Sequence, residues 1–195
     1  MTWFGYTPAQ WGLFFYLYSF LGWLWESGYV SFRQGRWVNR GFLRGPILPL
    51  YGFGALALLS LLLPWAASPA LTFLVGMTGA TALEYITGQA LESLFGVRYW
   101  DYSMYRWNLK GYICLPASLC WGFFSVTLLP LHRSLGWALG RMPARTLGAA
   151  LLALTALTAA DTLLALQRAA GGELPPGEET QSLALTAAPR SGAKR

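Results

Sequence analysis

Long apolar segments alternate with short polar or basic segments along the chain. Four stretches contain no charged residue: 1–25, 45–83, 111–131 and 146–160. A helix that crosses a membrane needs about 20 mostly apolar residues. The pattern therefore predicts an all-α, polytopic transmembrane helical bundle with about five spans. We expect these spans at residues 9–30, 46–63, 70–94, 112–129 and 146–166.

The composition points to the same class of protein. Charged residues make up 11% of the chain and apolar residues 55%, whereas a soluble domain carries about 25% charged residues. The net charge of +6 does not indicate nucleic acid, because the basic residues gather at the ends of apolar segments, as they do in membrane proteins. The expected partner is the lipid bilayer, and no nucleic acid is expected.

The basic residues also predict an orientation in a bacterial cytoplasmic membrane. Lys and Arg are enriched in cytoplasmic loops. Those that follow the first and third spans are Arg33, Arg36, Arg40, Arg44, Arg98, Arg106 and Lys110. This distribution predicts an outside N-terminus and an inside C-terminus, although Arg133, Arg141 and Arg145 would then lie outside. If residues 146–166 do not cross the membrane, the C-terminus lies outside instead.

The chain divides by composition into two parts. Residues 1–168 form the expected transmembrane domain. Residues 169–195 are rich in Gly, Pro, Ser and Thr and contain no aromatic residue. Such a composition is typical of disorder, so we expect a disordered cytoplasmic tail.

One segment of the chain occurs twice. RWVNRGFLRGPILPLYGFG (36–54) aligns without a gap with RWNLKGYICLPASLCWGFF (106–124), and GWLWES (22–27) matches GQALES (88–93). The match predicts two parallel two-span repeats at about residues 12–63 and 78–130, related by an axis along the membrane normal, an architecture found in transporters. The alternative is that two loops share Trp and Arg only because both lie at the membrane interface.

Ionisable side chains inside the expected spans are the first candidates for function, because they are unfavourable in lipid. They are Glu26, Glu84, Glu92 and Asp161. Glu84 lies deepest in its span. The residues spaced by four around it are small or polar: Thr72, Gly76, Ala80, Glu84, Gly88 and Glu92. Small residues at this spacing let another helix come close, so Glu84 is expected to face the bundle. Asp161 is not included in the site.

Two interpretations of these acids remain open. In one, they line a polar cavity near the cytoplasmic face that binds a polar or charged solute. In the other, they form structural pairs with arginines of the basic loops, since buried ion pairs specify geometry more than they add stability. The candidate solute-binding residues are Glu84, Glu92, Glu26, Arg40, Lys110, Asp101 and Asn108.

Sequence signatures of catalysis are missing. The chain has no Gly-x-x-x-x-Gly-Lys-Ser/Thr motif, so it is not expected to hydrolyse ATP itself. Cys114 and Cys120 are interpreted as packing residues. We expect no enzyme activity, cofactor or metal site. A weaker alternative is an intramembrane enzyme that uses Glu84 as a general acid or base.

Several of these segments together resemble a known family. The resemblance rests on Glu26, NRGFLRGPILPLYGFGA (39–55), LEYITGQALESLFGVRYWDYS (83–103) and NLKGYICLPASLCWG (108–122). The chain is similar there to the bacterial Putative ABC-transporter type IV membrane proteins, over residues 11–124. The resemblance implies a multi-span permease. Our first functional hypothesis is therefore a permease subunit that works with a separate ATP-binding subunit, and a homo-oligomer is a further expected assembly. The alternative function is a regulatory or interaction membrane protein that transports nothing.

Overall fold

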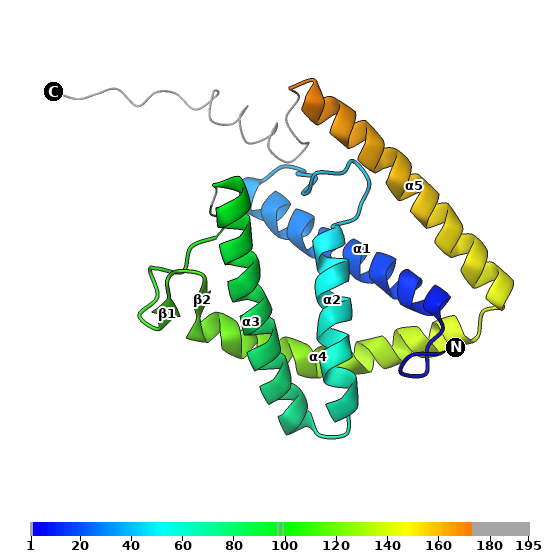
Figure 1. Ribbon diagram of the computed structural model, residues 1–195, viewed down its shortest axis with the longest axis horizontal. Coiled ribbons are helices and arrows are strands. Elements are labelled where there is room, and N and C mark those ends of the chain that lie inside the picture. Colours follow the sequence, from blue (N-terminus) through cyan, green and yellow to red (C-terminus); the bar gives the residue numbers. More distant parts are fainter. Residues whose placement is uncertain (1, 97, 99, 173–195) are drawn as a thin grey trace. The chain divides into compact units, whose positions relative to one another are not determined.

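The computed structural model describes residues 2–96, 98 and 100–172, and most of this part of the chain is helical (Figure 1). Its elements in chain order are α1 (Pro8–Gln34), α2 (Pro49–Leu62), the 3-10 helix η1 (Leu63–Trp65), α3 (Pro69–Phe95), β1 (Asn108–Leu109), β2 (Ile113–Cys114), α4 (Leu115–Gly140) and α5 (Ala144–Ala170). The predicted all-α class is confirmed. The five helices of the described residues coincide with the five predicted spans to within a few residues at most ends.

Local sequence signals account for where the helices begin and end. The Thr7 side chain caps α1 by accepting from Gln10 N, and the Gln10 side chain bonds back to Thr7 N. This reciprocal pair satisfies amide donors that the first helical turn leaves without partners. The first and third helices each end at a glycine in the left-handed conformation, Gly35 (φ 64°) and Gly96 (φ 67°). Glycine adopts this conformation without steric cost.

Three helices of the described residues are long and apolar enough to cross a membrane: α3, α4 and α5. The segment Pro49–Trp65 is a shorter apolar helix. Large apolar side chains point away from the protein interior, including Leu152 (73% exposed) and Leu157 (68% exposed). Lipid is as apolar as leucine, so such exposure is ordinary in a membrane. The protein is a multi-pass membrane protein, and crossing by α1 and α2 stays a prediction.

The fourth helix differs from its predicted extent. The predicted span ended at residue 129, before Pro130, but α4 continues through that proline to Gly140. A proline removes one backbone donor and usually bends or ends a helix. Because Pro130 has no N–H, the carbonyl of Val126, four residues earlier, loses its helical donor, and membrane helices tolerate such a proline. The Ser134 hydroxyl donates to the carbonyl of Pro130 at 3.0 Å, a bond within the helix that does not replace the missing donor. Arg133 consequently lies within a helix and not in a loop.

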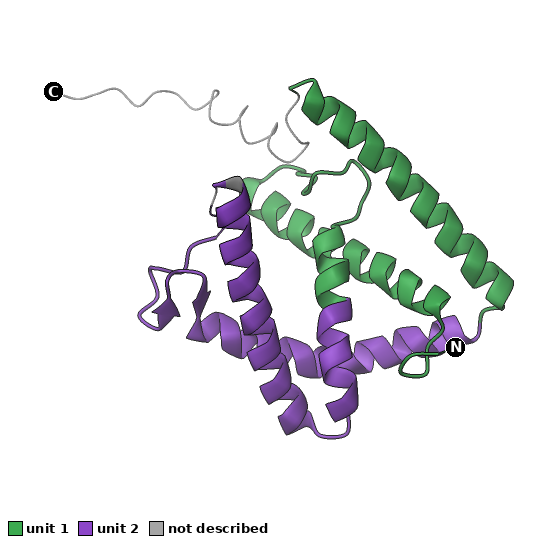
Figure 2. Ribbon diagram, in the orientation of Figure 1, with its two compact units in different colours: residues 1–55, 142–195 green, residues 56–141 purple. Residues whose placement is uncertain are grey.

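The chain forms two compact units (Figure 2). One comprises residues 1–55 and 142–195, and the other residues 56–141. The helix α5 continues to Ala170. The predicted tail falls mainly at 173–195, which lies outside the described residues.

In the 56–141 unit, α3 packs on α4 through small residues. Thr72, Gly76, Ala80 and Gly88 are buried, as expected for the face of α3 that carries the four-residue spacing. A Cβ atom at Gly76 would overlap the side chain of Ser125 on α4. Glycine therefore lets the two helix backbones approach more closely than any other residue allows.

In the other unit, α1 contacts both the start of α2 and α5. Gly22 faces the ring of Tyr51, and Gly52 faces Ser19. The Tyr16 hydroxyl donates to Thr155 on α5 at 3.2 Å. The Asp161 carboxylate accepts from the backbone N of Gly45 at 2.7 Å, which ties α5 to the loop between α1 and α2.

Several local features recur in the two predicted repeats. Gly41 (φ 110°) and Gly111 (φ 73°) occupy equivalent positions and are both left-handed. Gly52 and Gly122 are also equivalent, and each lies against a side chain of the preceding long helix. The matching loops fall in different units, so the predicted repeat and its axis stay a prediction.

Candidate functional site

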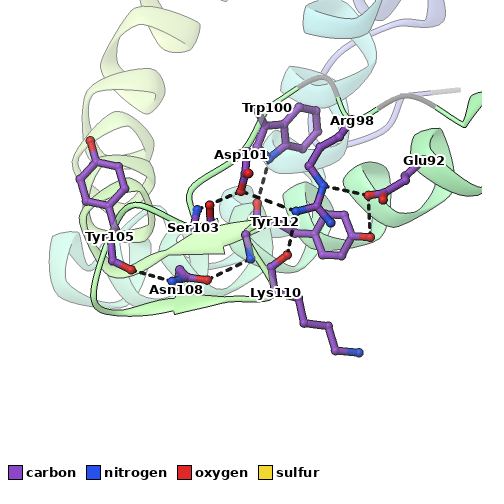
Figure 3. A network of polar contacts seen from close by, with 10 residues as sticks. Glu92, Arg98, Trp100, Asp101, Ser103, Tyr105, Asn108, Lys110 and Tyr112 are labelled. Atoms are coloured by element: carbon purple, nitrogen blue, oxygen red, sulfur yellow. Dashed lines mark hydrogen bonds and ion pairs between the residues drawn. The ribbon is translucent and has the colours of Figure 1, made fainter.

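Glu92, near the end of α3, fastens the loop between α3 and α4. Its Oε2 atom accepts a hydrogen bond from Arg98 Nε at 3.0 Å and another from the Tyr112 hydroxyl at 2.8 Å (Figure 3). The Arg98 guanidinium also lies over the Tyr112 ring, 4.6 Å from its centroid, a favourable cation–π geometry. One carboxylate oxygen thus joins the helix to both ends of the loop.

Arg98 continues the network into the loop. Its Nη1 atom donates to the carbonyl of Lys110 at 3.2 Å and lies 3.5 Å from Asp101 Oδ1. The same Asp101 oxygen accepts from Ser103 N at 2.9 Å. The pKa of Asp101 is lowered mainly by the hydrogen bond from the Ser103 backbone N–H. The Ser103 side chain and the charge of Arg98 lower it further. The hydrogen bond to Glu92 raises the pKa of Arg98, so both groups are charged at neutral pH.

A tight turn at Lys110 and Gly111 joins β1 to β2. Both residues have positive φ, 52° and 73°, which is the requirement at the two central residues of a type I′ turn. Tyr112 N donates to Leu109 O at 3.1 Å across the turn. The Asn108 side chain accepts from Gly111 N at 3.0 Å and donates to Tyr105 O at 2.6 Å. Asn108 therefore shapes the loop through its own hydrogen bonds.

We predict that the Lys110 side chain is dispensable for the structure of this loop. Its backbone carbonyl accepts from Arg98, while the side chain points away from the network (Figure 3). Asparagine tolerates positive φ better than lysine, so Lys110→Asn is expected to leave the thermal midpoint Tm unchanged or slightly higher. In the control Gly111→Ala, the new Cβ would overlap Asp101 Oδ1, and Tm should fall by about 3 °C or more. Equal losses in both variants would contradict this role for Lys110.

Glu84 joins α3, the loop and α4 at a second point. Its Oε1 accepts from the Tyr102 hydroxyl at 3.0 Å, and its Oε2 accepts from Trp121 Nε1 at 2.9 Å. All three residues are partly buried. Burial, and then the neighbouring carboxylate, raise the pKa of the Tyr102 phenol, so this group keeps its proton. Glu84 faces the bundle, as the spacing around it predicted.

The predicted site residues of the other unit form a separate pair. Arg40 Nη2 donates to Glu26 Oε1 at 3.3 Å, and Arg40 N donates to the Ser27 hydroxyl oxygen at 3.1 Å. The two charged side chains are about one-third exposed, 35% for Arg40 and 30% for Glu26. An exposed pair of this kind contributes little to stability. Its geometric effect is to hold the loop after α1 against the end of that helix.

The predicted site residues therefore fall into two groups. Glu84, Glu92, Asp101, Asn108 and Lys110 all belong to α3 and the loop that follows it. Glu26 and Arg40 belong to the other unit. The expected pairing of glutamates with loop arginines holds for Glu26 and Glu92.

Sequence reasoning missed the aromatic partners Tyr102, Tyr112 and Trp121. Trp and Tyr also gather at membrane interfaces without any further role, so their presence in the loop did not indicate these contacts. It also omitted Asp161, which accepts from Arg44 N and Gly45 N and lies 3.9 Å from Arg168. The signal for Asp161 was present, since it is an acid within an apolar segment.

The 56–141 unit also has an open hollow of about 270 Å³ beside the hairpin. The residues that line it are Arg106, Trp107, Asn108, Leu109, Ile113, Cys114, Leu115 and Ser118. Of the predicted site residues, Asn108 contributes to this surface.

Comparison with known proteins identifies a family. A family model described as Putative ABC-transporter type IV matches residues 13–166. The match extends beyond α4 through most of α5, a region that carries none of the motifs recognised in the sequence. No curated protein and no solved structure matches the chain.

Proposed function

Because the chain belongs to the Putative ABC-transporter type IV family, we propose that it is the permease subunit of a transporter whose ATP-binding subunit is a separate chain. The protein supplies the membrane-spanning helices, and the partner supplies ATP hydrolysis. A polar or charged small solute binds beside Glu84. Glu92, Arg98 and Asp101 hold the neighbouring loop in place around that position.

The observation that carries this proposal is the setting of Glu84. A carboxylate lies within a helix long and apolar enough to cross the membrane, and its two hydrogen-bond donors are neutral. Ionisable groups at such positions are unfavourable in lipid and usually belong to a substrate or ion pathway. The donors come from α4 and from the loop. A solute that displaces either donor would therefore change how α3 is held against α4 or against the loop.

The basic loops provide a surface for the ATP-binding subunit. We place the protein in a bacterial cytoplasmic membrane with the loops after α1 and α3 inside, following the positive-inside bias. Arg106 is exposed on the loop after α3. Charged groups at the rim of an interface set its rate of assembly and its specificity.

A regulatory or interaction protein is the second candidate. It is favoured by the arginine partners of Glu26 and Glu92, because in this interpretation the acids only fix the shape of the loops. The basic loops would then bind a cytoplasmic protein or anionic lipid, which contributes about 1 kcal/mol per basic residue near the surface.

Purification at native expression level separates the two candidates. The protein is extracted from its own membranes in mild detergent, and its companions are quantified by mass spectrometry and assayed for ATP hydrolysis. We expect an ATP-binding subunit in fixed ratio with vanadate-sensitive ATPase activity. A preparation without such a subunit would favour the regulatory candidate.

A matched pair of charge reversals tests the docking surface in the same assay. A basic loop is expected to bind an acidic surface of the ATP-binding subunit, so Arg106→Glu would place two negative charges against each other. We expect it to reduce the recovered subunit about tenfold. Arg141→Glu, at the other end of α4, is expected to leave the recovery unchanged. The opposite pattern would place the partner on the other side of the membrane.

A further inference from the structure

Carboxylates in the described residues differ in how their charge is balanced. Four of them lie within 4.0 Å of an arginine nitrogen. These pairs are Glu26–Arg40 at 3.3 Å, Glu92–Arg98 at 3.0 Å, Asp101–Arg98 at 3.5 Å and Asp161–Arg168 at 3.9 Å. Glu84 differs, because its hydrogen-bond partners in the described part of the chain are the neutral Tyr102 and Trp121. It is therefore the described carboxylate without a positive neighbour.

The basic residues of the same unit are engaged elsewhere. Arg98 binds Glu92, and the Lys110 side chain points away from the network (Figure 3). The others contact an aromatic ring or a carbonyl: Arg106 lies 5.9 Å from the Trp107 ring centroid, Arg141 lies 3.6 Å from that of Trp137, and Arg133 Nη2 donates to Ala66 O at 3.1 Å. None of these described cations balances the charge of Glu84.

Glu84 retains capacity to bind another donor. An ionised carboxylate has roughly four acceptor positions, and the hydrogen bonds from Tyr102 and Trp121 occupy one on each oxygen. The indole N–H of Trp121 only donates, so it orients the carboxylate without competing for an incoming donor. Because Glu84, Tyr102 and Trp121 are partly exposed in their unit, a ligand can reach the remaining positions.

The neighbouring groups favour an organic cation over a metal ion. Metal ions such as Ca²⁺ need several oxygen ligands, whereas one of the two groups beside Glu84 is an indole N–H that cannot coordinate a metal. Each donor has another aromatic ring beside it. The ring centroids of Trp121 and Phe124 are 6.2 Å apart, and those of Tyr102 and Tyr105 are 6.1 Å apart. An ammonium group supplies donors for the remaining acceptor positions of Glu84, and aromatic rings of the kind found nearby attract such cations.

We propose that Glu84 binds the positive charge of the transported solute, and that this solute is an organic ammonium compound. The inference rests on the proposed permease function and names its class of solute. Tyr102 and Trp121 position the carboxylate. Glu26, Glu92, Asp101 and Asp161 keep their arginine partners and take no part in binding the cation.

The test measures ligand binding to the purified full-length protein in mild detergent. Tm is recorded with methylammonium, tetramethylammonium or 1,4-diaminobutane as chloride salts, against sodium chloride of equal ionic strength. A ligand that binds only the folded state raises Tm as its concentration passes Kd. We expect at least one ammonium salt to raise the Tm of the wild type.

Variants then assign the effect to Glu84. Glu84→Gln is expected to weaken binding about tenfold or more, because a hydrogen bond to a charged group is much stronger than one to a neutral group. Glu84→Asp keeps the charge and should retain part of the response. Asp161→Asn removes a carboxylate from α5 that already has an arginine partner, and it should respond as the wild type does.

Two results would overturn the inference. They are no rise in Tm with any of the three salts, and an equal rise in Glu84→Gln. If the first result is accompanied by a wild-type Tm that falls with increasing pH, Glu84 holds a proton in place of a solute. Recovery of an ATP-binding subunit together with either of these leaves the permease proposal standing and removes only the ammonium site. Ammonium binding without such a subunit would keep the ammonium site and remove the permease proposal.

Discussion

A Gly76→Ala variant is expected to lose about 1–3 kcal/mol of unfolding free energy, the usual effect of overpacking a close-packed interior. The added Cβ would overlap both the Cβ and the hydroxyl of Ser125, a residue with no solvent exposure, and would lie 3.3 Å from Leu62 Cδ2. In an open helix position the same change is stabilising by roughly 0.5–1 kcal/mol, because glycine loses more backbone entropy on folding than alanine. The sign of the effect at Gly76 is therefore set by helix packing.

Gly148 on α5 is the matched control, because nothing lies within 4 Å of a Cβ placed there. Gly148→Ala is expected to stabilise the protein or leave it unchanged. Ser125→Gly should restore much of the loss when it is combined with Gly76→Ala, since it removes the atoms that collide. Unfolding in mild detergent with increasing SDS measures all four proteins. Stabilisation by Gly76→Ala would show that α3 and α4 do not pack at this glycine.

Glu84→Gln is expected to abolish transport while the fold is kept. The glutamine oxygen can still accept from Trp121, and its amide can donate to the Tyr102 hydroxyl oxygen, so each partner keeps one hydrogen bond. The unfolding free energy should therefore change by about 1 kcal/mol or less. The negative charge is lost, and with it the group that we propose binds the solute.

Glu84→Ala separates the structural effect from the functional one. It leaves the Trp121 N–H and the Tyr102 hydroxyl without their partner, and each such loss costs about 1–3 kcal/mol when the group is buried. We expect Glu84→Ala to be less stable than Glu84→Gln, although both are inactive. Thermal unfolding and uptake, measured on the same preparations, test this order. A Glu84→Gln variant with normal uptake would exclude Glu84 from the mechanism.

Much of the fold follows from where charges are missing. The charge-free stretches place all five helices, and proline or a capping Thr or Ser marks the starts of α1 and α3. The end of α4 was not predictable in this way, because Pro130 normally indicates a boundary and here lies inside the helix.

The candidate site was predictable in part. Acids within apolar segments identified Glu26, Glu84 and Glu92, and the abundance of arginine in the loops predicted partners for two of them. The sequence did not indicate that Tyr102 and Trp121 would bind Glu84. These residues lie 18 and 37 positions away in the chain, and the same residue types occur at membrane interfaces without any further role.

ATP-driven accumulation in membrane vesicles tests the permease proposal most directly. Vesicles from cells that contain the wild-type protein and its native partners are loaded with ATP or with a non-hydrolysable analogue. They are then incubated with a ¹³C-labelled polar metabolite extract, and the labelled compounds retained are identified by mass spectrometry. We expect at least one labelled compound to accumulate only with ATP and only when Glu84 is present. Identical retention with ATP, with the analogue and in the Glu84→Gln vesicles would contradict a transport function.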